Sequence, residues 1–408
     1  MSDTLTTPPD GAPRPLDGIR VIELGQLLAG PFTGSILAYF GAEVIKVEPP
    51  GEGDPIRGWR IVENGTSHWW RSLGRNKKSV TVDLKSEKGR ELVKELLKTA
   101  DVVVENFRPG VIEKWGLGPE DLKPFNPGLI YARISGYGQT GPYSSKPGYA
   151  SVTEGVSGFR YVNGFPGEPP VRPNLSIGDT ISGIHAALGV CLSLLQRAKA
   201  PEHDGQVVDV ALYESMFNLM EAVVPEFSGA GEIRGASGTT VTGIVPTNTY
   251  TCADGKYVVI GGNGDSIYKR LMVAAGHPDM AEDPEMANNE GRVVHEEKID
   301  KALADWCASI PAQEVIDILE AERVPVGLIY NVEDQMNDPH FNDRGMFEEV
   351  DIDGKPLKIP AIMPKLSGTP GRTDWPGGEV GSHNDEILKG VLNLSDDEIA
   401  ALKADGVC

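Results

Sequence analysis

Hydrophobic positions in the first half of the chain alternate between two patterns. Short, continuous apolar runs are typical of strands buried on both faces, and they predict strands at 18–24, 43–48, 79–84, 101–106, 129–135 and 206–212. Apolar residues spaced three or four positions apart predict helices at 32–40, 86–100 and 181–195. Strands that alternate with helices in this way form a parallel sheet, so the sequence predicts an α/β domain.

The second half of the chain shows a different arrangement from about residue 227. Two strands at 249–252 and 256–260, separated by a short turn, predict a hairpin. Helices are expected up to residue 275 and over 296–308 and 311–322, followed by a strand at 324–330. Beyond residue 331 the periodicity is weak until a capped helix at 395–405. The pattern therefore predicts a second, smaller domain over residues 227–328.

The N-terminal segment, residues 1–15, is rich in threonine and proline and lacks an apolar core. We interpret it as a flexible leader and expect it to be neither a signal peptide nor a transit peptide. Elsewhere no apolar run reaches the length that a membrane span needs, so no membrane partner is expected. The large domain is then predicted to begin at residue 16 and to extend to about residue 226.

Composition narrows the class of protein further. The chain has 408 residues and a formal net charge of -21, which argues against nucleic acid or an anionic membrane as a partner. Its four cysteines are far apart and share no paired spacing, which fits reduced thiols and a cytoplasmic location. Its seven histidines are scattered as well, so we predict no metal site.

One segment departs from the acidic balance of the chain. Between Arg57 and Lys78 there are six basic residues and one acidic residue, a local net charge of +5, with Trp59, Trp69 and Trp70 among them. A solvated loop with aromatic side chains buried for stability is one interpretation. The other is a site for a phosphorylated ligand with a flat ring, because basic groups pair with phosphates and stack on aromatic planes.

Asp179 lies where a predicted helix begins, directly after Gly178. One interpretation is a helix cap, in which the carboxylate accepts hydrogen bonds from the free N–H groups of the first turn. The other is a nucleophilic carboxylate held at the start of a helix. The residues alone leave both interpretations open.

Two glycine-containing loops are candidates for ligand contact. Residues 261–264, Gly-Gly-Asn-Gly, follow a predicted strand and form either a tight turn or a row of free N–H groups for an oxyanion. Residues 107–110 follow the predicted strand 101–106, at the strand end where an open α/β sheet binds ligands. The spacing of Gly25, Gly30 and Gly34 does not match a dinucleotide-binding turn.

Nearly the whole chain, from about residue 16 to 392, resembles the class III CoA-transferase family, which includes formyl-CoA transferase and carnitine CoA-transferases. Each motif is weak alone, but their order and spacing are specific. The resemblance is carried by residues 16–24, 29–31, 41–48, 53–54, 75–79, 105–110, 135–142, 179, 209–214 and 261–264.

The resemblance implies an α/β, Rossmann-like large domain with a smaller α+β domain. It also implies that residues 329–408 return to complete the large domain, and that two subunits thread through each other as an interlocked homodimer. Some relatives pair unequal subunits, so a hetero-oligomer is an alternative. No metal or redox cofactor is implied, since the coenzyme A thioesters are substrates.

By resemblance, Asp179 is the nucleophile that carries the acyl group as an anhydride and then CoA as a thioester. The glycine loop, with Gly261, Gly262 and Gly264, would cover the intermediates, and Gln26 would line the acyl site. Further residues are implied to bind substrate or CoA: Trp59, Arg75, Lys77, Lys78, Asn106, Phe107, Arg108, Arg133 and Tyr137.

Within the family, the chain is similar to enzymes that move CoA from succinyl-CoA to a dicarboxylic acid such as malate, citramalate, itaconate or benzylsuccinate. Arg60, Arg71 and Lys269 are candidates for holding the second carboxylate of the acceptor. An α-methylacyl-CoA racemase is the alternative activity. Those relatives have a histidine where this chain has the stretch from Gly148 to Ala150, so the second acid/base group is missing.

Overall fold

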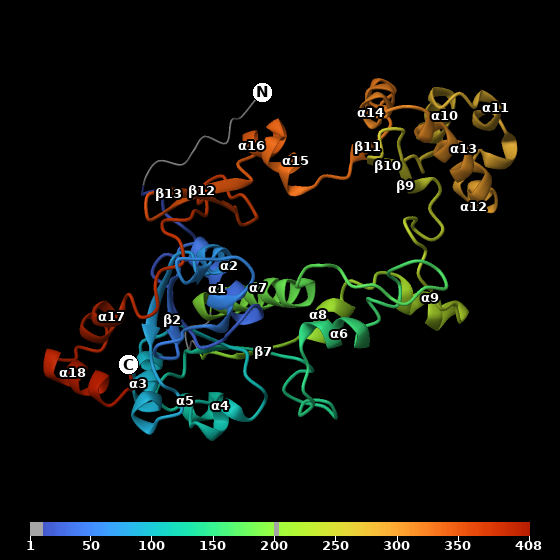
Figure 1. Cartoon of the computed structure of the whole chain (residues 1–408). Helices are drawn as coiled ribbons and strands as arrows, with labels where there is room; N and C mark the ends of the chain where they lie inside the picture. The colour runs from blue at the N-terminus through green and yellow to red at the C-terminus, as the bar shows by residue number, and fades with distance from the viewer. Residues whose placement is uncertain (1–10, 200–203) are drawn as a thin grey trace. The chain divides into compact units, whose positions relative to one another are not determined.

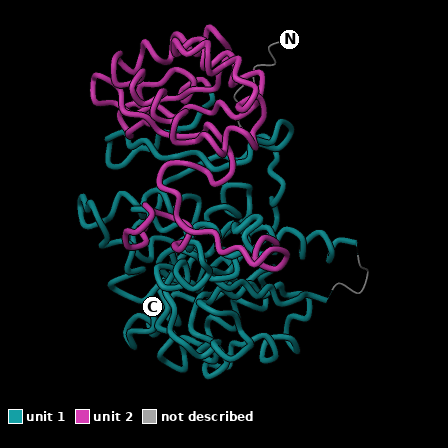
Figure 2. Tube along the Cα trace, turned by 90° about the vertical axis from the view of Figure 1, so that its right-hand side faces the viewer, with its two compact units in different colours: residues 1–159, 173–224, 344–408 teal, residues 160–172, 225–343 magenta. Residues whose placement is uncertain are grey.

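The computed structural model describes residues 11–199 and 204–408, which form two compact units (Figure 2). Unit 1 contains the described residues of 11–159, 173–224 and 344–408, and unit 2 contains residues 160–172 and 225–343. The division differs from the predicted one, because residues 160–172, 225–226 and 329–343 belong to unit 2. One contact inside unit 2 explains part of this difference: the Gly238 N–H donates to the Gly164 carbonyl at 2.8 Å.

A six-stranded parallel sheet forms the centre of unit 1 (Figure 1). All six predicted strands are present, with shorter bounds in most cases, and β5 begins two residues before the predicted start at 79. Their order across the sheet is β5 (Lys77–Thr81), β2 (Glu43–Glu48), β1 (Arg20–Glu23), β6 (Val102–Glu105), β7 (Ile130–Ser135) and β8 (Val207–Ala211). The predicted α/β class with a parallel sheet is confirmed.

Alternate residues of these strands fill two separate cores, one on each face of the sheet. Val21 and Val44 pack with α1 (Ala29–Tyr39) and α7 (Ile177–Lys199) on one face. Ile22 and Ile45 face the other core. The helices that contribute to this second core are α3 (Glu87–Lys98), α4 (Val111–Lys114), α5 (Pro119–Leu122), α17 (Asn384–Gly390) and α18 (Asp396–Ala404).

Two helix starts show why these segments fold locally as predicted. The Ser86 hydroxyl accepts a hydrogen bond from the Gly89 N–H at 3.0 Å and caps α3. Ser395 and Glu398 form a reciprocal capping box at the start of α18. Because α17 and α18 pack on the same face as α3, the end of the chain completes the core that its first half begins.

Several short elements of unit 1 were not predicted. The segment interpreted as a long loop contains η1 (Pro55–Gly58), the small hairpin of β3 (Val62–Glu63) and β4 (Thr66–Ser67), and α2 (His68–Leu73). A hairpin of β12 (Phe347–Ile352) and β13 (Lys355–Pro360) lies in the weakly periodic C-terminal segment. The remaining helices of unit 1 are α6 (Ala150–Val156) and α8 (Leu212–Phe217).

Unit 2 is built on a three-stranded antiparallel sheet in the order β11 (Val326–Leu328), β10 (Tyr257–Gly261), β9 (Thr247–Thr251). The predicted hairpin is confirmed as the pair of β9 and β10. The chain enters through α9 (Val223–Ala230). The other helices of the unit are α10 (Asp265–Ala274), α11 (Pro278–Ala281), η2 (Pro284–Met286), α12 (Asn289–Val294), α13 (Glu296–Ser309), α14 (Ala312–Ala321), α15 (Val332–Asn337) and α16 (Pro339–Asp343).

Helix α7 has 23 residues and, among the described helices, is the one that is long and apolar enough to cross a membrane by length and composition. The expectation that no apolar segment reaches this length is therefore wrong. Ala186, Ala187 and Val190 of α7 are buried against α1 and the sheet. A helix that packs in a protein core passes the same test, so its composition alone does not indicate a membrane span.

Candidate functional site at the carboxyl edge of the sheet

The strand order of unit 1 reverses between β1 and β6. The chain runs outward through β2 and β5, then returns to β6 on the other side of β1. Open parallel sheets bind ligands outside the carboxyl ends of the strands at such a reversal. The two segments that follow β1 and β6 carry four of the predicted site residues: Gln26, Asn106, Phe107 and Arg108.

Asn106 and Gln26 lie directly against each other across this reversal. The Asn106 side-chain amide donates to the Gln26 carbonyl at 2.8 Å, and its oxygen accepts from the Gln26 N–H at 2.8 Å. Phe107 is partly buried, with its ring 5.1 Å from that of Trp115. The Arg108 side chain is exposed and makes no ion pair with another described residue. The structure thus brings these residues together, and their contact with substrate stays a prediction.

Asp179 lies in the first turn of α7, also in unit 1, and is partly buried. The helix begins at Ile177 and not at the predicted residue 181, so Asp179 is its third residue. The interpretation of Asp179 as the capping residue is therefore wrong, although an acid in the first turn still faces the positive end of the helix dipole.

Gly178 allows α6 to approach the start of α7 closely. A Cβ atom on Gly178 would lie 3.0 Å from the Ala150 methyl group and 3.4 Å from an Oε atom of Glu154. Glu154 is fully buried. The racemase relatives carry a histidine in the stretch that corresponds to Gly148–Ala150. In this structure that stretch contributes the Ala150 methyl group, which packs against Gly178, the residue before Asp179.

The glycine loop belongs to unit 2, between β10 and α10. The Gly261 N–H donates to the Pro325 carbonyl at 3.0 Å, and the Gly262 N–H donates to the Pro246 carbonyl at 2.9 Å. The predicted row of free N–H groups is therefore wrong for these two residues. Asn263 and Gly264 have N–H groups that make no hydrogen bond within the described part of the chain.

Arg292 holds this loop from inside unit 2. Its side chain is fully buried and donates to the Asn263 carbonyl at 2.6 Å, to the Val245 carbonyl at 2.9 Å and to the Asp265 carboxylate at 2.9 Å. Two of these bonds fix the C-terminal end of the glycine loop, at Asn263 and Asp265. Arg292 was not among the predicted site residues, because nothing in the local sequence indicates burial of this arginine.

The basic residues predicted to bind CoA phosphates are largely paired with acids inside unit 1. Lys77 is buried and contacts Glu23 at 2.8 Å, and burial lowers the pKa of Lys77 although Glu23 opposes the shift. The other predicted basic residues of this set also form ion pairs, among them Arg75–Glu348 at 3.3 Å, Lys78–Glu43 at 2.8 Å and Arg133–Glu105 at 2.8 Å.

The same pairing occurs in the rest of the basic segment. Arg57 pairs with Glu48 and Arg71 pairs with Glu379, both at 2.7 Å. The local charge of +5 is thus offset by acids that are distant in the sequence. Arg57, Arg71, Arg75 and Lys77 are buried, so the interpretation of the segment as a solvated loop is wrong for them. CoA binding by Arg75, Lys77, Lys78 and Arg133 stays a prediction.

Aromatic residues of the predicted site remain accessible to different degrees. Trp59 is 42 % exposed, and its ring centroid lies 6.3 Å from that of Trp69. The guanidinium carbon of the exposed Arg60 lies over the Trp69 ring, 4.9 Å from its centroid. Tyr137 is nearly buried, with its ring 5.8 Å from Tyr213. Lys269 lies on the surface of unit 2 and contacts Glu282. The roles of these residues in binding the acceptor or CoA stay predictions.

Among the residues that the structure describes, no cluster of three or more histidine, cysteine or acidic side chains could hold a metal ion. Cys252 and Cys307 are both buried in unit 2, and burial raises the pKa of the Cys307 thiol to about 12. Such thiols are inert at neutral pH. That catalysis needs no metal or cofactor stays a prediction.

Comparison with known proteins identifies the family. The family described as CoA-transferase family III matches residues 16–384. A succinyl-CoA–D-citramalate CoA-transferase from Chloroflexus aurantiacus is 46% identical over 96% of this chain and 98% of the relative. The alpha subunit of a succinyl-CoA–L-malate CoA-transferase from the same species is 38% identical over 99% of this chain and 95% of the relative.

A solved structure agrees with these matches. The crystal structure of a CAIB/BAIF family protein from Brucella suis is 32% identical, covers 93% of this chain and 99% of its own, and superimposes with a TM-score of 0.81. The likeness extends over both the sheet domain and the smaller unit, since the match covers nearly all of each chain. The chain therefore belongs to CoA-transferase family III and is a CoA-transferase.

Proposed function

We propose that this protein transfers CoA from succinyl-CoA to a dicarboxylic acid of the citramalate or malate type. The observation that carries this proposal is the likeness to the D-citramalate transferase over nearly the entire chain. The relative named as the alpha subunit of a succinyl-CoA–L-malate CoA-transferase supports the same pair of substrate classes. Both acceptors are short hydroxy-dicarboxylic acids, so they share the groups that a site must recognise.

We assign the nucleophile to Asp179. Its carboxylate attacks the succinyl-CoA carbonyl, and the C–S bond breaks to give an aspartyl–succinyl anhydride and CoA thiolate. The thiolate then attacks the aspartyl carbonyl, which releases succinate and leaves CoA on Asp179 as a thioester. The acceptor carboxylate attacks this thioester to form a second anhydride, and the returning thiolate completes acyl-CoA and frees Asp179.

The position of Asp179 supports this role. A carboxylate is ionised at neutral pH and needs no base to attack. Its place in the first turn of α7 aims the charge at the positive end of a long helix, which stabilises the ionised form. N–H groups that make no internal bond, such as those of Asn263 and Gly264, are suited to oxyanion binding in general.

The test is an exchange assay with succinyl-CoA and a panel of dicarboxylic acids, read by succinate release. We expect D-citramalate or L-malate to give the highest rate, and Asp179→Ala to abolish release while CoA still binds. Hydroxylamine added with succinyl-CoA should inactivate the wild type by trapping activated Asp179, and should not modify the variant.

A matched control is Asp101→Asn, since Asp101 pairs with Arg197 at 2.6 Å and lies at the opposite end of β6 from the site. This variant should keep its turnover. Substantial succinate release by Asp179→Ala would refute covalent catalysis at this residue. No release with any acid of the panel would refute the assigned substrates.

We also propose that the working form is an interlocked homodimer. Helix α7 presents an apolar stripe at helical spacing, formed by Ile184, Leu188, Leu192 and Leu195, with 46%, 54%, 57% and 51% of each side chain exposed. Exposed apolar patches of this kind mark interfaces between proteins. Ile184 also lines a cavity of about 360 Å³ with Phe32 and Trp69. A second copy of the chain is the occupant that the family resemblance implies.

A further inference from the structure

The turn that carries Gln26 is held by side chains from three other segments. Besides the two hydrogen bonds to Asn106, the Leu27 N–H donates to both Asp54 carboxylate oxygens at 3.1 and 3.2 Å. The Gly25 carbonyl accepts from the Lys46 ammonium group, and the Gly25 N–H donates to the Val104 carbonyl. The N–H groups of residues 25–27 and the carbonyls of Gly25 and Gln26 are therefore engaged.

The holding groups are themselves fixed. Lys46 and Asp54 are both buried and contact each other at 2.8 Å, and Lys46 also contacts Glu23 at 3.2 Å. Burial alone would lower the pKa of Lys46, but the neighbouring carboxylates of Asp54, Glu23 and Glu48 raise it above its ordinary value. The ammonium group thus stays charged and keeps its bond to the turn.

Leu27 adopts a left-handed backbone conformation, with φ of 64°. A leucine in this region is strained, and the conformation persists only where surrounding contacts determine it. The Asp54 carboxylate supplies such a contact at the Leu27 N–H, and the Asn106 side chain supplies two at the preceding residue, Gln26. Without them the turn would relax and the direction of the Gln26 side chain would change.

Two glycines make room for Asn106. A Cβ atom on Gly25 would lie 3.0 Å from the Asn106 side-chain oxygen, and one on Gly30 would lie 3.4 Å from its Cγ. Both contacts are tight, so a larger residue at either position would displace the amide. The glycine pair that did not fit a dinucleotide turn therefore has a different purpose, namely the close approach of this amide.

The Gln26 side chain contrasts with its main chain. It is partly buried, and its amide makes no hydrogen bond to another described residue. Both polar atoms of Asn106, in turn, are already bonded to Gln26. An unengaged amide on a rigid turn, at the reversal of the sheet, is suited to donate to an oxygen that gains charge.

We propose that Asn106 is a positioning residue. It holds the Gln26 main chain so that the Gln26 side-chain amide reaches the thioester oxygen during transfer. This inference rests on the proposed function and replaces direct contact with CoA as the main role of Asn106. Asp54 and Lys46 support the same turn. Because Asn106 acts through Gln26, its loss should affect turnover more than the binding of succinyl-CoA.

The test compares Asn106→Asp with Asn126→Asp in the full chain. Asn126 is the matched control, because its amide also donates to main-chain carbonyls, those of Leu97 and Ala100, away from the site. In Asn106→Asp an oxygen replaces the donor that faces the Gln26 carbonyl. A small misplacement of a catalytic group costs up to about 100-fold, so we expect kcat to fall at least about tenfold with KM for succinyl-CoA little changed.

Asn126→Asp should lower the melting temperature but keep kcat. A raised KM for succinyl-CoA with unchanged kcat in Asn106→Asp would overturn the inference, because that pattern indicates lost ground-state contact with CoA. The double variant gives a second test. In a Gln26→Ala background, Asn106→Asp should lower kcat by less than about twofold. If the loss of kcat in the double variant equals the product of the losses in the two single variants, the inference is also overturned.

Hydrogen exchange tests the positioning without any assay of activity. In Asn106→Ala the main-chain amide proton of Gln26 loses its acceptor, so hydrogen exchange in a peptide covering residues 24–30 should become faster. Asn126→Ala should leave the exchange of this peptide unchanged. Equal exchange in the wild type and Asn106→Ala would overturn the inference. If the wild type transfers CoA to no acid, the proposed function fails, yet this measurement still decides the role of Asn106.

Discussion

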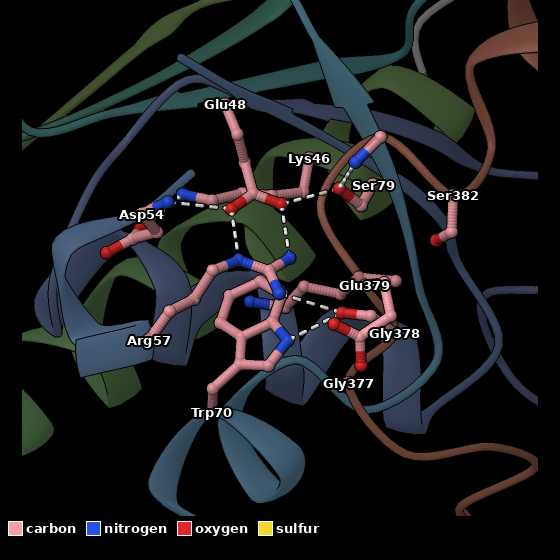
Figure 3. Close-up of polar contacts among 12 residues, drawn as sticks. Lys46, Glu48, Asp54, Arg57, Trp70, Ser79, Gly377, Gly378, Glu379 and Ser382 are labelled. Carbon is pink, nitrogen blue, oxygen red and sulfur yellow. Dashed lines mark hydrogen bonds and ion pairs between the residues drawn. The ribbon is translucent and has the colours of Figure 1, made fainter. Parts of the chain in front are cut away.

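Glu48 shows how a single buried carboxylate organises the basic segment around it (Figure 3). It accepts hydrogen bonds from Arg57 through two nitrogens at 2.7 Å, from the Ser79 hydroxyl at 2.6 Å and from the Asp54 N–H at 2.7 Å. Burial alone would raise the pKa of Glu48, but Arg57, Lys46 and Ser79 together lower it below the ordinary value of 4.5.

The lowered pKa fixes the direction of a pH dependence. Ionised Glu48 stabilises the fold fully above pH 4.5, and this contribution is lost as the pH falls through the lower folded-state pKa. Glu48→Gln leaves the buried Arg57 without its partner, so we expect it to cost about 3 kcal/mol of unfolding free energy at pH 7. In urea unfolding, the difference between variant and wild type should shrink as the pH falls below about 4.5.

Glu379→Gln is the control for this measurement. Its ion pair with Arg71 is as short, but the Glu379 side chain is 64% exposed, so water screens the charge and the loss should be much smaller. An ionic contribution must fade when the carboxylate is protonated. If the loss of unfolding free energy caused by Glu48→Gln stays constant down to pH 3.5, the stabilisation does not come from the ionised Glu48 carboxylate.

At the residue scale the sequence predicts chemical type better than spatial role. Gln26, Asn106 and Arg108 were identified, and the structure places them together at the reversal of the sheet. The basic residues were expected to face phosphate, but Glu23 and Glu48 reach them from other strands. A local charge count cannot include acids that are distant in the sequence. Lys46 offered one signal, since it lies between the apolar residues Ile45 and Val47 of a buried strand.

At the scale of elements, the glycine loop of unit 2 has a strict packing requirement at one position. A Cβ atom on Gly262 would lie 2.4 Å from a Leu271 methyl group and 3.1 Å from Pro246. Both neighbours belong to the packed interior of unit 2, and Leu271 is fully buried. The loop can therefore keep its path only with glycine at this position.

Gly262→Ala should destabilise unit 2 by about 1–3 kcal/mol, the usual cost of forcing a methyl group into a packed core. Hydrogen exchange of peptides covering residues 247–275 measures this directly. Gly327→Ala is the matched control, since Gly327 lies on β11 and a Cβ atom there meets nothing within 4 Å. Equal protection in Gly262→Ala and Gly327→Ala would show that the loop adapts at no cost.

Long, strongly patterned elements were the predictable part of the fold. Apolar runs identified each strand of the parallel sheet, and capping residues located α3 and α18. Short elements such as α2 and the hairpin of β12 and β13 were missed. Their stability comes from tertiary contacts, as when Trp70 of α2 donates to the Gly378 carbonyl at 2.9 Å, and no local periodicity reports such contacts.

At the scale of the whole molecule, the chain passes between the two units four times, at residues 159–160, 172–173, 224–225 and 343–344. Unit 1 is closed by its own C-terminal segment. The Asn76 side chain donates to the Arg372 carbonyl at 2.8 Å and accepts from the Asp374 N–H at 2.7 Å. The chain therefore forms a closed path out of unit 1, through unit 2 and back.

A closed path of this kind has a kinetic consequence in an interlocked dimer. A second subunit threaded through it can leave only when the contacts between the C-terminal segment and the rest of unit 1 open. Two homodimers with different tags should therefore exchange subunits far more slowly than a dimer of side-by-side subunits, even at high dilution. Native mass spectrometry of the mixture, which distinguishes the mixed dimer by its tags, measures this rate.

Asn76→Ala should accelerate the exchange of subunits, because it removes bonds that hold residues 372 and 374 on unit 1. Each such bond contributes about 1 kcal/mol, so the loss of two should speed opening by about tenfold or more. Asn126→Ala removes bonds only within residues 97–126, outside the C-terminal segment. It should lower the stability of the fold. Under conditions that give it the same fold stability as the wild type, its subunits should exchange at the wild-type rate. Rapid exchange in the wild type would refute threading, since subunits that merely adjoin need no opening of unit 1 to separate.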